Sequence, residues 1–429
     1  MQEEPLMELP GAESFPRFAK IKRNFPDLSI KDIDGAVREA MRKSGIAGGI
    51  RPKSKIAITA GSRGIKNIVE VLRAAGDFVR ERGANPFIVP AMGSHGGATA
   101  PGQKALLAEL GISENTVGMP VRSNMETVEI GHTVGGTPVF TDRIAFDSDG
   151  IIAVNRVKPH TSLVGALGSG ICKMLVVGLG KEPGASAFHR LGPIELEKIL
   201  PEMARIVIEK APIIGGVGLV EDAWDNLSIV KGALPRDILR VDEELVNEAC
   251  RLMPRLPFDE LDVLVFEEMG KDISGTGMDA NVIGRRGIRL VPDIPTPRIR
   301  RIVVLGLSAH SQGNAHGIGL ADIVTERLAK AIDWAVTREN ALASSFPEKG
   351  MLPLAFPTDR EAISAALMTS WVADTGKARM VIARNTLALD KLYISESLLE
   401  KAIEKDGIEK EGDLIPLKFN ENGLLISKW

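Results

Sequence analysis

The sequence predicts an α/β fold, with two α/β domains and the active site in the cleft between them. Short apolar runs alternate with amphipathic helical patterns along the chain, which is typical of sheets with helices on their faces. A length of 429 residues allows two domains with sizeable cores. Residues 233–260 mix an amphipathic helix with a proline-containing turn, so we expect an N-terminal domain over 1–250 and a C-terminal domain over 251–429.

The N-terminal block shows the alternation most clearly. Buried strands are predicted at KIAIT (55–59), PFIVP (86–90), GIIAV (150–154) and GGVGLV (215–220), and helices at 65–82, 102–111 and 193–211. Loops rich in glycine, proline or histidine follow three of these strands, namely GSRG (61–64), GSHGG (93–97) and VKPH (157–160). Ligand sites in open α/β sheets gather at the carboxyl ends of strands, so these loops are expected to line one crevice.

The C-terminal block repeats the pattern. Strands are predicted at 261–270, 300–308 and 378–383, and helices at 318–342, 360–373 and 395–407. The segment GTGMDA (275–280) matches the loose dinucleotide-binding pattern G-x-G-x-x-A but lacks a strand–turn–helix context, so it is interpreted as a loop or a substrate contact.

Composition excludes several classes of protein. A net charge of −3 and an aromatic content of 4% argue against a nucleic-acid or anionic-membrane surface. The two cysteines, Cys172 and Cys250, cannot form a disulfide framework or a cysteine-rich metal site. We find no apolar run long enough to span a bilayer and no signal peptide, so a soluble, cytoplasmic protein is predicted. No oligomeric state follows from the sequence.

Four residues in loop-forming surroundings are the first candidates for chemistry: His95, His160, Lys173 and His189. Imidazole changes its protonation near neutral pH and binds borderline metals, and loops expose side chains to clefts. The alternative for each histidine is that it only satisfies loop backbone groups.

Other motifs carry less weight. His310 and His316 could form a metal pair, although loop histidines without a third ligand are usually solvated or capping. His132 follows a strand-like segment and is expected to face solvent or to pair across a sheet, while Trp224 and Trp371 are expected to be packing residues. The sequence contains neither a G-x-x-x-x-G-K-[ST] phosphate loop nor a G-x-S-x-G elbow.

The order of five residues resembles the nickel-pincer nucleotide-dependent lactate racemase family. They are Arg63, His95, His160, Lys173 and His189, separated by 32, 65, 13 and 16 residues. The last gap is the most diagnostic. The similarity covers the N-terminal two-thirds of the chain, and the chain is identified as a member of the wider family rather than a lactate racemase.

The resemblance implies a cofactor and a role for each residue. In this family a lysine carries the nickel-pincer nucleotide (pyridinium-3,5-bisthiocarboxylic acid mononucleotide with nickel) through a thioamide link. Lys173 would be the attachment residue. His189 would be the nickel ligand beside the cofactor's carbon and two sulfurs, and His95 and His160 would be the catalytic acid/base pair.

The same resemblance extends to substrate and nucleotide contacts. Arg63 offers a planar, bidentate fork for a carboxylate, and Lys271 of MGKD matches the family's second substrate-site lysine. Gly165, Gly168 and Gly170 would let the backbone approach the nucleotide closely.

The implied activity is a racemase or epimerase of a 2-hydroxy acid. Removal of a hydride from the substrate gives a stable 2-keto acid, and an electron-poor pyridinium can accept that hydride. One base takes the hydroxyl proton, and inversion needs a second base on the opposite face, which predicts two histidines. The implied partners are the 2-hydroxy acid and the cofactor-synthesis enzymes.

The sequence departs from the family where SRGIKN (62–67) replaces an arginine–proline pair and where GSHGGAT (93–99) is small and open. A roomier pocket favours a longer substrate such as malate, 2-hydroxyglutarate or a sugar acid. Two other classes stay open. A nicotinamide-dependent 2-hydroxy acid dehydrogenase should show a full dinucleotide fingerprint, which GSRGIKN (61–67) lacks, and a non-catalytic protein could bind a small acid through Arg63 and Lys271.

Overall fold

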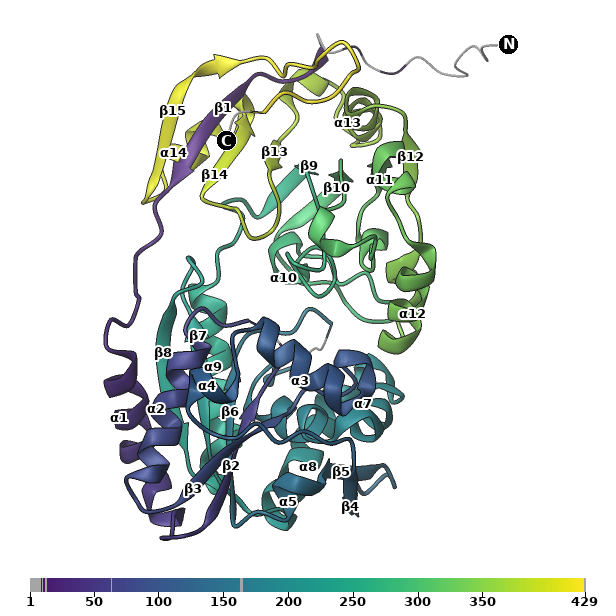
Figure 1. The fold of residues 1–429 in the computed structure, drawn as a ribbon. Helices are drawn as coiled ribbons and strands as arrows, with labels where there is room; N and C mark the ends of the chain where they lie inside the picture. Colours follow the sequence, from purple (N-terminus) through teal and green to yellow (C-terminus); the bar gives the residue numbers. More distant parts are fainter. Residues whose placement is uncertain (1–8, 10, 12–13, 63, 163–164, 428–429) are drawn as a thin grey trace. The chain divides into compact units, whose positions relative to one another are not determined.

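The chain forms two compact units in the computed structural model, which describes residues 9, 11, 14–62, 64–162 and 165–427 (Figure 1). Unit 2 is Pro26–Met253, and unit 1 joins Met1–Phe25 to Pro254–Trp429. The division near residue 253 lies close to the expected boundary at 250. The expected N-terminal domain over 1–250 also included the first 25 residues, but these belong to unit 1. β1 (Phe18–Arg23) pairs with strands of unit 1, because its backbone fills the place between β14 and β15 (Figure 1).

Unit 2 is built on a five-stranded sheet in the order β3-β2-β6-β7-β8. The first four strands run parallel and β8 is antiparallel to β7. A separate hairpin joins β4 to β5. The strands are β2 (Lys55–Ala60), β3 (Asn85–Pro90), β4 (Thr127–His132), β5 (Pro138–Asp142), β6 (Gly150–Arg156), β7 (Ile213–Glu221) and β8 (Leu227–Ala233). The four strands predicted in this block are therefore confirmed.

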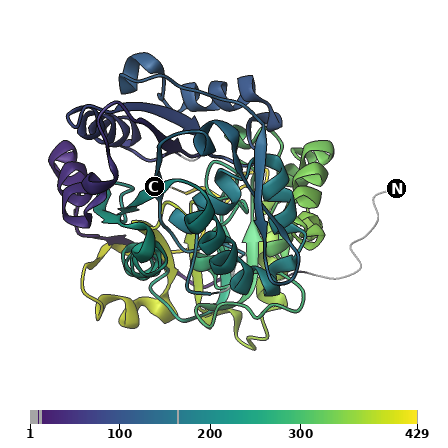
Figure 2. The ribbon, with the colours of Figure 1, turned by 90° about the horizontal axis from the view of Figure 1, so that it is seen from below.

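Side chains alternate across this sheet and build a core on each face. Ile56 and Ile58 of β2 pack into one core, while Ala57 between them packs into the other. One core is completed by α1 and α2 and the other by α8 and α9, so unit 2 has three layers (Figure 1, Figure 2). The helices are α1 (Ile33–Ser44), α2 (Ile68–Arg80), α3 (Ala100–Glu109), α4 (Glu114–Val117), α5 (Arg143–Phe146), α6 (Ile171–Lys173), α7 (Lys181–His189), α8 (Gly192–Lys210) and α9 (Ile238–Leu252).

Unit 1 is built on an eight-stranded mixed sheet in the order β12-β11-β10-β9-β13-β14-β1-β15. Its first five strands are parallel and the last three are antiparallel to their neighbours. The remaining strands are β9 (Glu260–Phe266), β10 (Arg298–Val304), β11 (Ile323–Thr325), β12 (Leu354–Phe356), β13 (Met380–Ala383), β14 (Lys391–Ser395) and β15 (Ile408–Ile415). The helices are α10 (Ala280–Ile283), α11 (Glu326–Lys330), α12 (Trp334–Ser344), α13 (Asp359–Met368) and α14 (Glu396–Ile403).

The helix predicted over 318–342 is wrong in its first part. A buried three-residue strand, β11, occupies residues 323–325, and α11 and α12 follow it separately. Thr325 ends the strand and its hydroxyl caps α11 by accepting a hydrogen bond from the Leu328 amide. The Asp333 side chain caps α12 in the same way. The two capping residues, Thr325 and Asp333, therefore begin two separate helices where the apolar pattern had predicted one.

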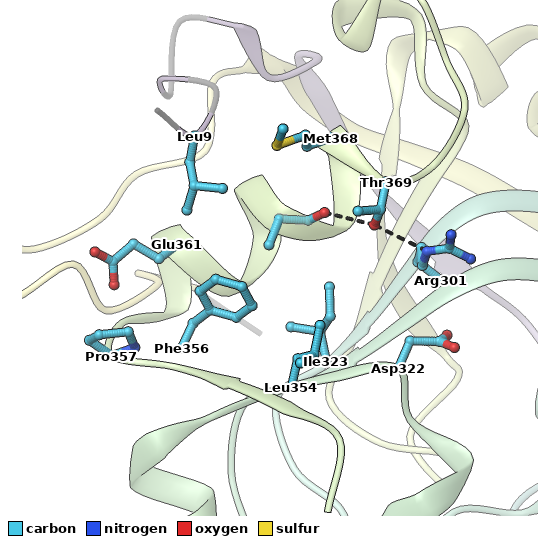
Figure 3. A pocket seen from close by; sticks show the side chains of 11 residues that line it. Leu9, Arg301, Asp322, Ile323, Leu354, Phe356, Pro357, Glu361, Met368 and Thr369 are labelled. Carbon is cyan, nitrogen blue, oxygen red and sulfur yellow. Dashed lines mark hydrogen bonds between the residues drawn. The ribbon is translucent and has the colours of Figure 1, made fainter. Parts of the chain in front are cut away.

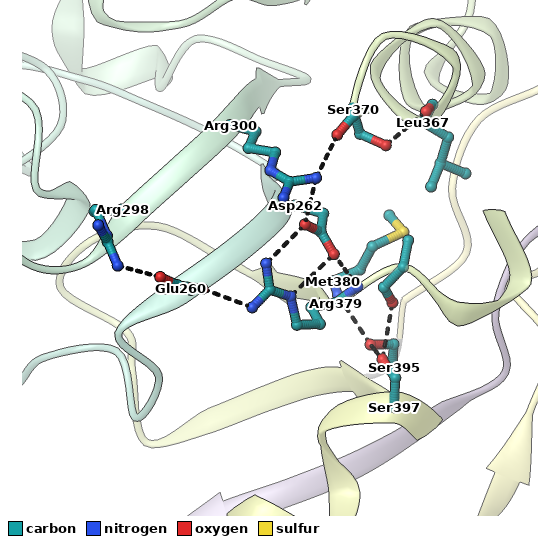
Figure 4. A network of polar contacts seen from close by, with 11 residues as sticks. Glu260, Asp262, Arg298, Arg300, Leu367, Ser370, Arg379, Met380, Ser395 and Ser397 are labelled. Carbon is teal, nitrogen blue, oxygen red and sulfur yellow. Dashed lines mark hydrogen bonds and ion pairs between the residues drawn. The ribbon is translucent and has the colours of Figure 1, made fainter. Parts of the chain in front are cut away.

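A polar network holds the amino ends of β9, β10 and β13 together (Figure 4). The buried Asp262 carboxylate accepts hydrogen bonds from the Arg379 amide at 2.8 Å and from its guanidinium at 2.9 and 3.1 Å. Arg300 approaches the same carboxylate at 3.2 Å. Trp371 is 76% exposed with the Arg301 guanidinium 4.9 Å from its ring centre, and Trp224 is also exposed, so the expectation that these two tryptophans are packing residues is wrong.

Candidate functional site

The predicted site residues of unit 2 gather at the carboxyl edge of its sheet. His95 follows β3, and His160 follows β6. Both strands belong to the same parallel sheet, so their carboxyl ends lie at one edge. Lys173 ends α6, which begins after the loop that leaves β6.

Lys173 and His160 are in direct contact. The Lys173 Nζ lies 2.6 Å from His160 Nε2, and the Ser162 amide donates a hydrogen bond to His160 Nδ1 at 3.0 Å. An imidazole nitrogen that accepts a hydrogen bond carries no proton, so the ring proton of the neutral histidine lies on Nε2. That N–H faces the Lys173 nitrogen across the 2.6 Å contact.

The charge of Lys173 also affects His189. It is the last residue of α7, and its ring meets Phe188 edge-on with centroids 5.3 Å apart. Burial, followed by the positive charge of Lys173, lowers the pKa of His189 to about 4. At neutral pH the imidazole is therefore neutral, which is the form that can bind a metal.

Gly168 and Gly170 are glycines because the chain itself approaches them closely. A Cβ on Gly168 would lie 2.3 Å from the Lys158 carbonyl oxygen, since Lys158 and Ser169 exchange backbone hydrogen bonds at 3.0 and 2.8 Å. A Cβ on Gly170 would lie 2.0 Å from an oxygen of Asp242. The nucleotide contact expected of both glycines stays a prediction.

Asp242 was missed in the sequence and holds the helix that carries Lys173. Its fully buried carboxylate accepts hydrogen bonds from the amides of Ile171 at 2.8 Å and Cys172 at 2.9 Å. Burial raises the pKa of Asp242, while the two amides oppose that rise. Nothing local in the α9 sequence marks this aspartate, because its partners are about 70 residues away.

The loop that carries His95 is tied to the segment after Lys173. The Gly93 amide donates to the Gly178 carbonyl at 3.1 Å, and Gly178 ends the π-helix η4 (Met174–Gly178). Such π-helical turns are rare and occur frequently at functional sites. His95 thus shares a backbone framework with Lys173.

A second group that the sequence did not reveal lies behind this loop. The Gln103 side-chain amide donates to the carbonyl oxygens of Gly93 at 2.8 Å and His95 at 3.2 Å. Its oxygen accepts a hydrogen bond from Lys181, a fully buried lysine. Lysine is rarely buried, so the residue type gave no signal of this placement.

The two remaining substrate candidates have different outcomes. Arg63 lies outside the described residues. Lys271 lies in unit 1, in the loop after β9, where its Nζ donates to the Gly275 carbonyl at 2.6 Å and to the Asn340 side chain at 2.8 Å. The segment GTGMDA (275–280) forms a turn that leads into the four-residue α10, which agrees with its interpretation as a loop.

The other histidines are not part of this group, because His132 lies on β4 while His310 and His316 belong to unit 1. His132 is exposed on β4 and pairs with Glu129 at 3.3 Å. His310 is exposed, whereas His316 is buried, and burial together with nearby lysines lowers the pKa of His316 to about 3. Within the described ranges, no three His, Cys, Asp or Glu side chains converge to hold a metal ion. A cofactor that supplies most ligands needs only one protein ligand, so the role predicted for His189 is not affected.

Unit 1 also contains a cavity of about 620 Å³ beside β11, β12 and α13 (Figure 3). Its lining is mainly apolar, with Ile323, Leu354 and Phe356 beside a polar corner formed by Arg301 and Asp322. It contains none of the predicted site residues. In the part of the chain that the structure describes, no helix is long and apolar enough to cross a membrane.

Fold and site together define a two-unit α/β protein with a lysine–histidine cluster at the carboxyl edge of one sheet. The family model of the lactate racemase N-terminal domain matches residues 27–197. This part of the chain is therefore similar to the N-terminal domain of lactate racemase, which confirms the resemblance predicted from the sequence.

A solved structure shows the same overall fold. The lactate racemase apoprotein from Thermoanaerobacterium thermosaccharolyticum is similar to this chain with a TM-score of 0.51 and 12% identity. The match covers 86% of this chain and 99% of that protein. It confirms the α/β class with two α/β domains. The search of the curated proteins found no match.

Proposed function

We propose that the protein is a racemase or epimerase of a 2-hydroxy acid that works by reversible hydride transfer to a lysine-tethered nickel-pincer nucleotide. The observation that carries this proposal is the 2.6 Å contact between Lys173 Nζ and His160 Nε2, inside the stretch that matches the family model of the lactate racemase N-terminal domain. An unprotonated amine is the nucleophilic form of lysine, which covalent attachment requires.

The residues of unit 2 fit such a cofactor. His189 offers a neutral imidazole beside Lys173, and one imidazole suits the remaining position around a nickel ion with soft donors. When bound, the group supplies a reversible hydride acceptor. Gly168 and Gly170 keep the backbone of the Lys173 loop compact.

His95 and His160 supply the acid/base chemistry in this proposal. One histidine takes the substrate's hydroxyl proton on a ring nitrogen, and the other returns a proton to the keto oxygen on the opposite face. Arg63 and Lys271 bind the carboxylate. The substrate, a 2-hydroxy acid longer than lactate, and the cofactor-synthesis enzymes are the partners, and the proposed location is the cytoplasm.

The first test is to produce the protein with and without the cofactor-synthesis enzymes. Intact mass and nickel content should show an adduct only after co-production, and only that sample should racemise a member of a panel containing lactate, malate, 2-hydroxyglutarate and sugar acids. Racemisation by protein without adduct or nickel would refute the mechanism. Acid binding without turnover in the loaded sample would favour the binding protein, and nicotinamide-dependent oxidation would favour the dehydrogenase.

Variants separate the individual roles. Lys173→Ala should abolish the adduct, whereas Lys210→Ala, which changes an exposed lysine of the same unit, should load normally. His189→Ala should load but lose nickel on dialysis, because one of the ligands is missing. Full nickel retention and turnover in His189→Ala would disprove the ligand assignment.

The acid/base assignment needs enantiomer-resolved turnover. His95→Ala and His160→Ala should each oxidise at most one enantiomer to the keto acid without releasing the other, because each face needs its own proton donor. His132→Ala, which removes an exposed histidine, is the matched control. Racemisation at the wild-type rate by either site variant would show that this histidine is a loop residue only.

A further inference from the structure

Lys181 is the first residue of α7 and its side chain is completely buried. Its Nζ donates hydrogen bonds to the Pro90 carbonyl at 2.6 Å and to Gln103 Oε1 at 2.9 Å, and it lies 3.1 Å from Asp142 Oδ2. These partners come from the end of β3, from α3 and from the end of β5. One ammonium group therefore connects three separate chain segments.

The ammonium group determines how the Gln103 amide is oriented. An ammonium can only donate hydrogen bonds, so it selects the oxygen of the Gln103 amide and leaves the NH2 group on the other side. That NH2 group donates to both the Gly93 and His95 carbonyl oxygens. The contact with Lys181 thus fixes the amide that holds both ends of the Gly93–His95 turn.

Burial of the two charged side chains, Lys181 and Asp142, costs desolvation free energy. Asp142 is also completely buried and its other oxygen accepts a hydrogen bond from the Ala145 amide at 2.8 Å. Burial lowers the pKa of Lys181 and raises that of Asp142, and each is opposed by the attraction between the two charges. A buried ion pair is often no more stable than an apolar replacement of similar volume, so stability alone does not explain it.

We propose that Lys181 is a positioning residue for His95, acting through the orientation of the Gln103 amide. This inference rests on the proposed function only in giving His95 a catalytic role. The placement of the His95 loop by Lys181 and Gln103 is a separate statement and can be measured on apoprotein.

Gln103→Glu is the sharpest variant. It keeps the size of the side chain and an oxygen for Lys181, but it removes the NH2 group that holds the Gly93 and His95 carbonyls. It also leaves α7 unchanged. Lys181→Met removes the ammonium, and the pair Lys181→Met with Asp142→Leu removes both buried charges so that no unpaired carboxylate remains.

The matched control is Ser148→Ala. Ser148 is a buried residue of the same unit whose hydroxyl donates to Ala145 and Gly150 carbonyls at 2.6 and 3.1 Å, before β6 begins. It removes a buried hydrogen-bonding group at the opposite edge of the sheet from the His95 loop. It should lower stability without moving the His95 signals.

Two readouts decide the proposal. On apoprotein labelled in its histidine rings, NMR should show that Gln103→Glu and the double variant shift the His95 resonances and their pH titration, while those of His132 and His310 stay unchanged. On the loaded enzyme, kcat should fall by about 10- to 100-fold with KM changed less than about twofold, because the acid/base group is misplaced while substrate contacts remain. Nickel content should stay at the wild-type level.

The outcomes are distinguishable. Wild-type His95 resonances in Gln103→Glu and in any folded Lys181 variant would overturn the positioning role, whatever the enzyme does. Shifted resonances in a protein that does not racemise any 2-hydroxy acid would retain the placement of the loop and refute the proposed function instead. A fall in kcat equal to that of Ser148→Ala would reduce Lys181 to a structural residue.

Discussion

Replacement of Asp242 should loosen the start of α6 and with it the position of Lys173. The carboxylate receives two backbone amides, Ile171 and Cys172, at 2.8 and 2.9 Å. Hydrogen bonds to a charged group contribute about 1.5–3 kcal/mol each, and burial of the carboxylate offsets part of this. We expect Asp242→Ala to lower the free energy of unfolding by about 2–4 kcal/mol.

Asp242→Asn is more specific because it preserves the shape of the side chain. One oxygen can still accept from Ile171, but the new NH2 group faces the Cys172 amide, which is also a donor. The expected loss is about 1–3 kcal/mol in urea unfolding followed by circular dichroism. Asp237→Asn is the control, because Asp237 makes surface ion pairs with Arg236 and Arg240 at the start of α9.

The same variant connects stability to function. After co-production with the cofactor-synthesis enzymes, the fraction of Asp242→Asn protein that carries the adduct should be lower than in Asp237→Asn, because Lys173 follows Cys172 directly. An unfolding free energy within about 0.5 kcal/mol of the wild type would refute the reasoning, since two amides would then not depend on this carboxylate.

Three further predictions concern stability. His316 has a pKa of about 3 in the folded protein and stays neutral there, whereas in the unfolded chain this histidine gains a proton below pH 6.5. The free energy of unfolding should therefore fall by about 2–3 kcal/mol between pH 7.5 and 4.5 in urea unfolding, and this loss should be absent in His316→Leu. Lys349, whose pKa burial lowers to about 8, should make stability rise with pH from 8 to 10.5, a slope that Lys349→Met should lack. Gly168→Ala should cost about 1–3 kcal/mol in thermal unfolding because of the 2.3 Å approach of the Lys158 carbonyl, whereas Gly48→Ala, in open space, should cost less.

The fold could be predicted where one strand carries its own signal. β2, β3 and β6 are continuous apolar runs because both of their faces are covered, and the sequence shows them directly. β15 has mainly exposed, charged residues, so its sequence does not look like a strand. β1 was missed because it depends on partners, β14 and β15, that lie more than 360 residues away in the chain.

The candidate site shows the same limit. Loops at strand ends predicted where His95 and His160 would lie, because the carboxyl edge of a parallel sheet is set by the topology. Lys181, Gln103 and Asp142 form one group only after β3, α3 and β5 have packed together. Such contacts follow from the complete tertiary structure and leave no periodic or local pattern.

Helix α7 contains both a site residue that the sequence predicted, His189, and one that it did not reveal, Lys181. Lys181 is its first residue and His189 its last, so a nine-residue helix separates the lysine behind the His95 loop from the proposed nickel ligand. A short helix that is hydrogen-bonded throughout changes length very little, so its two ends keep a fixed separation. In the proposed mechanism, α7 therefore helps to position both the acid/base loop, through Lys181, and the metal ligand, His189. A substitution of Lys181 changes α7 itself and can therefore affect both His95 and His189. Gln103 lies outside this helix, so Gln103→Glu tests the position of His95 without altering α7.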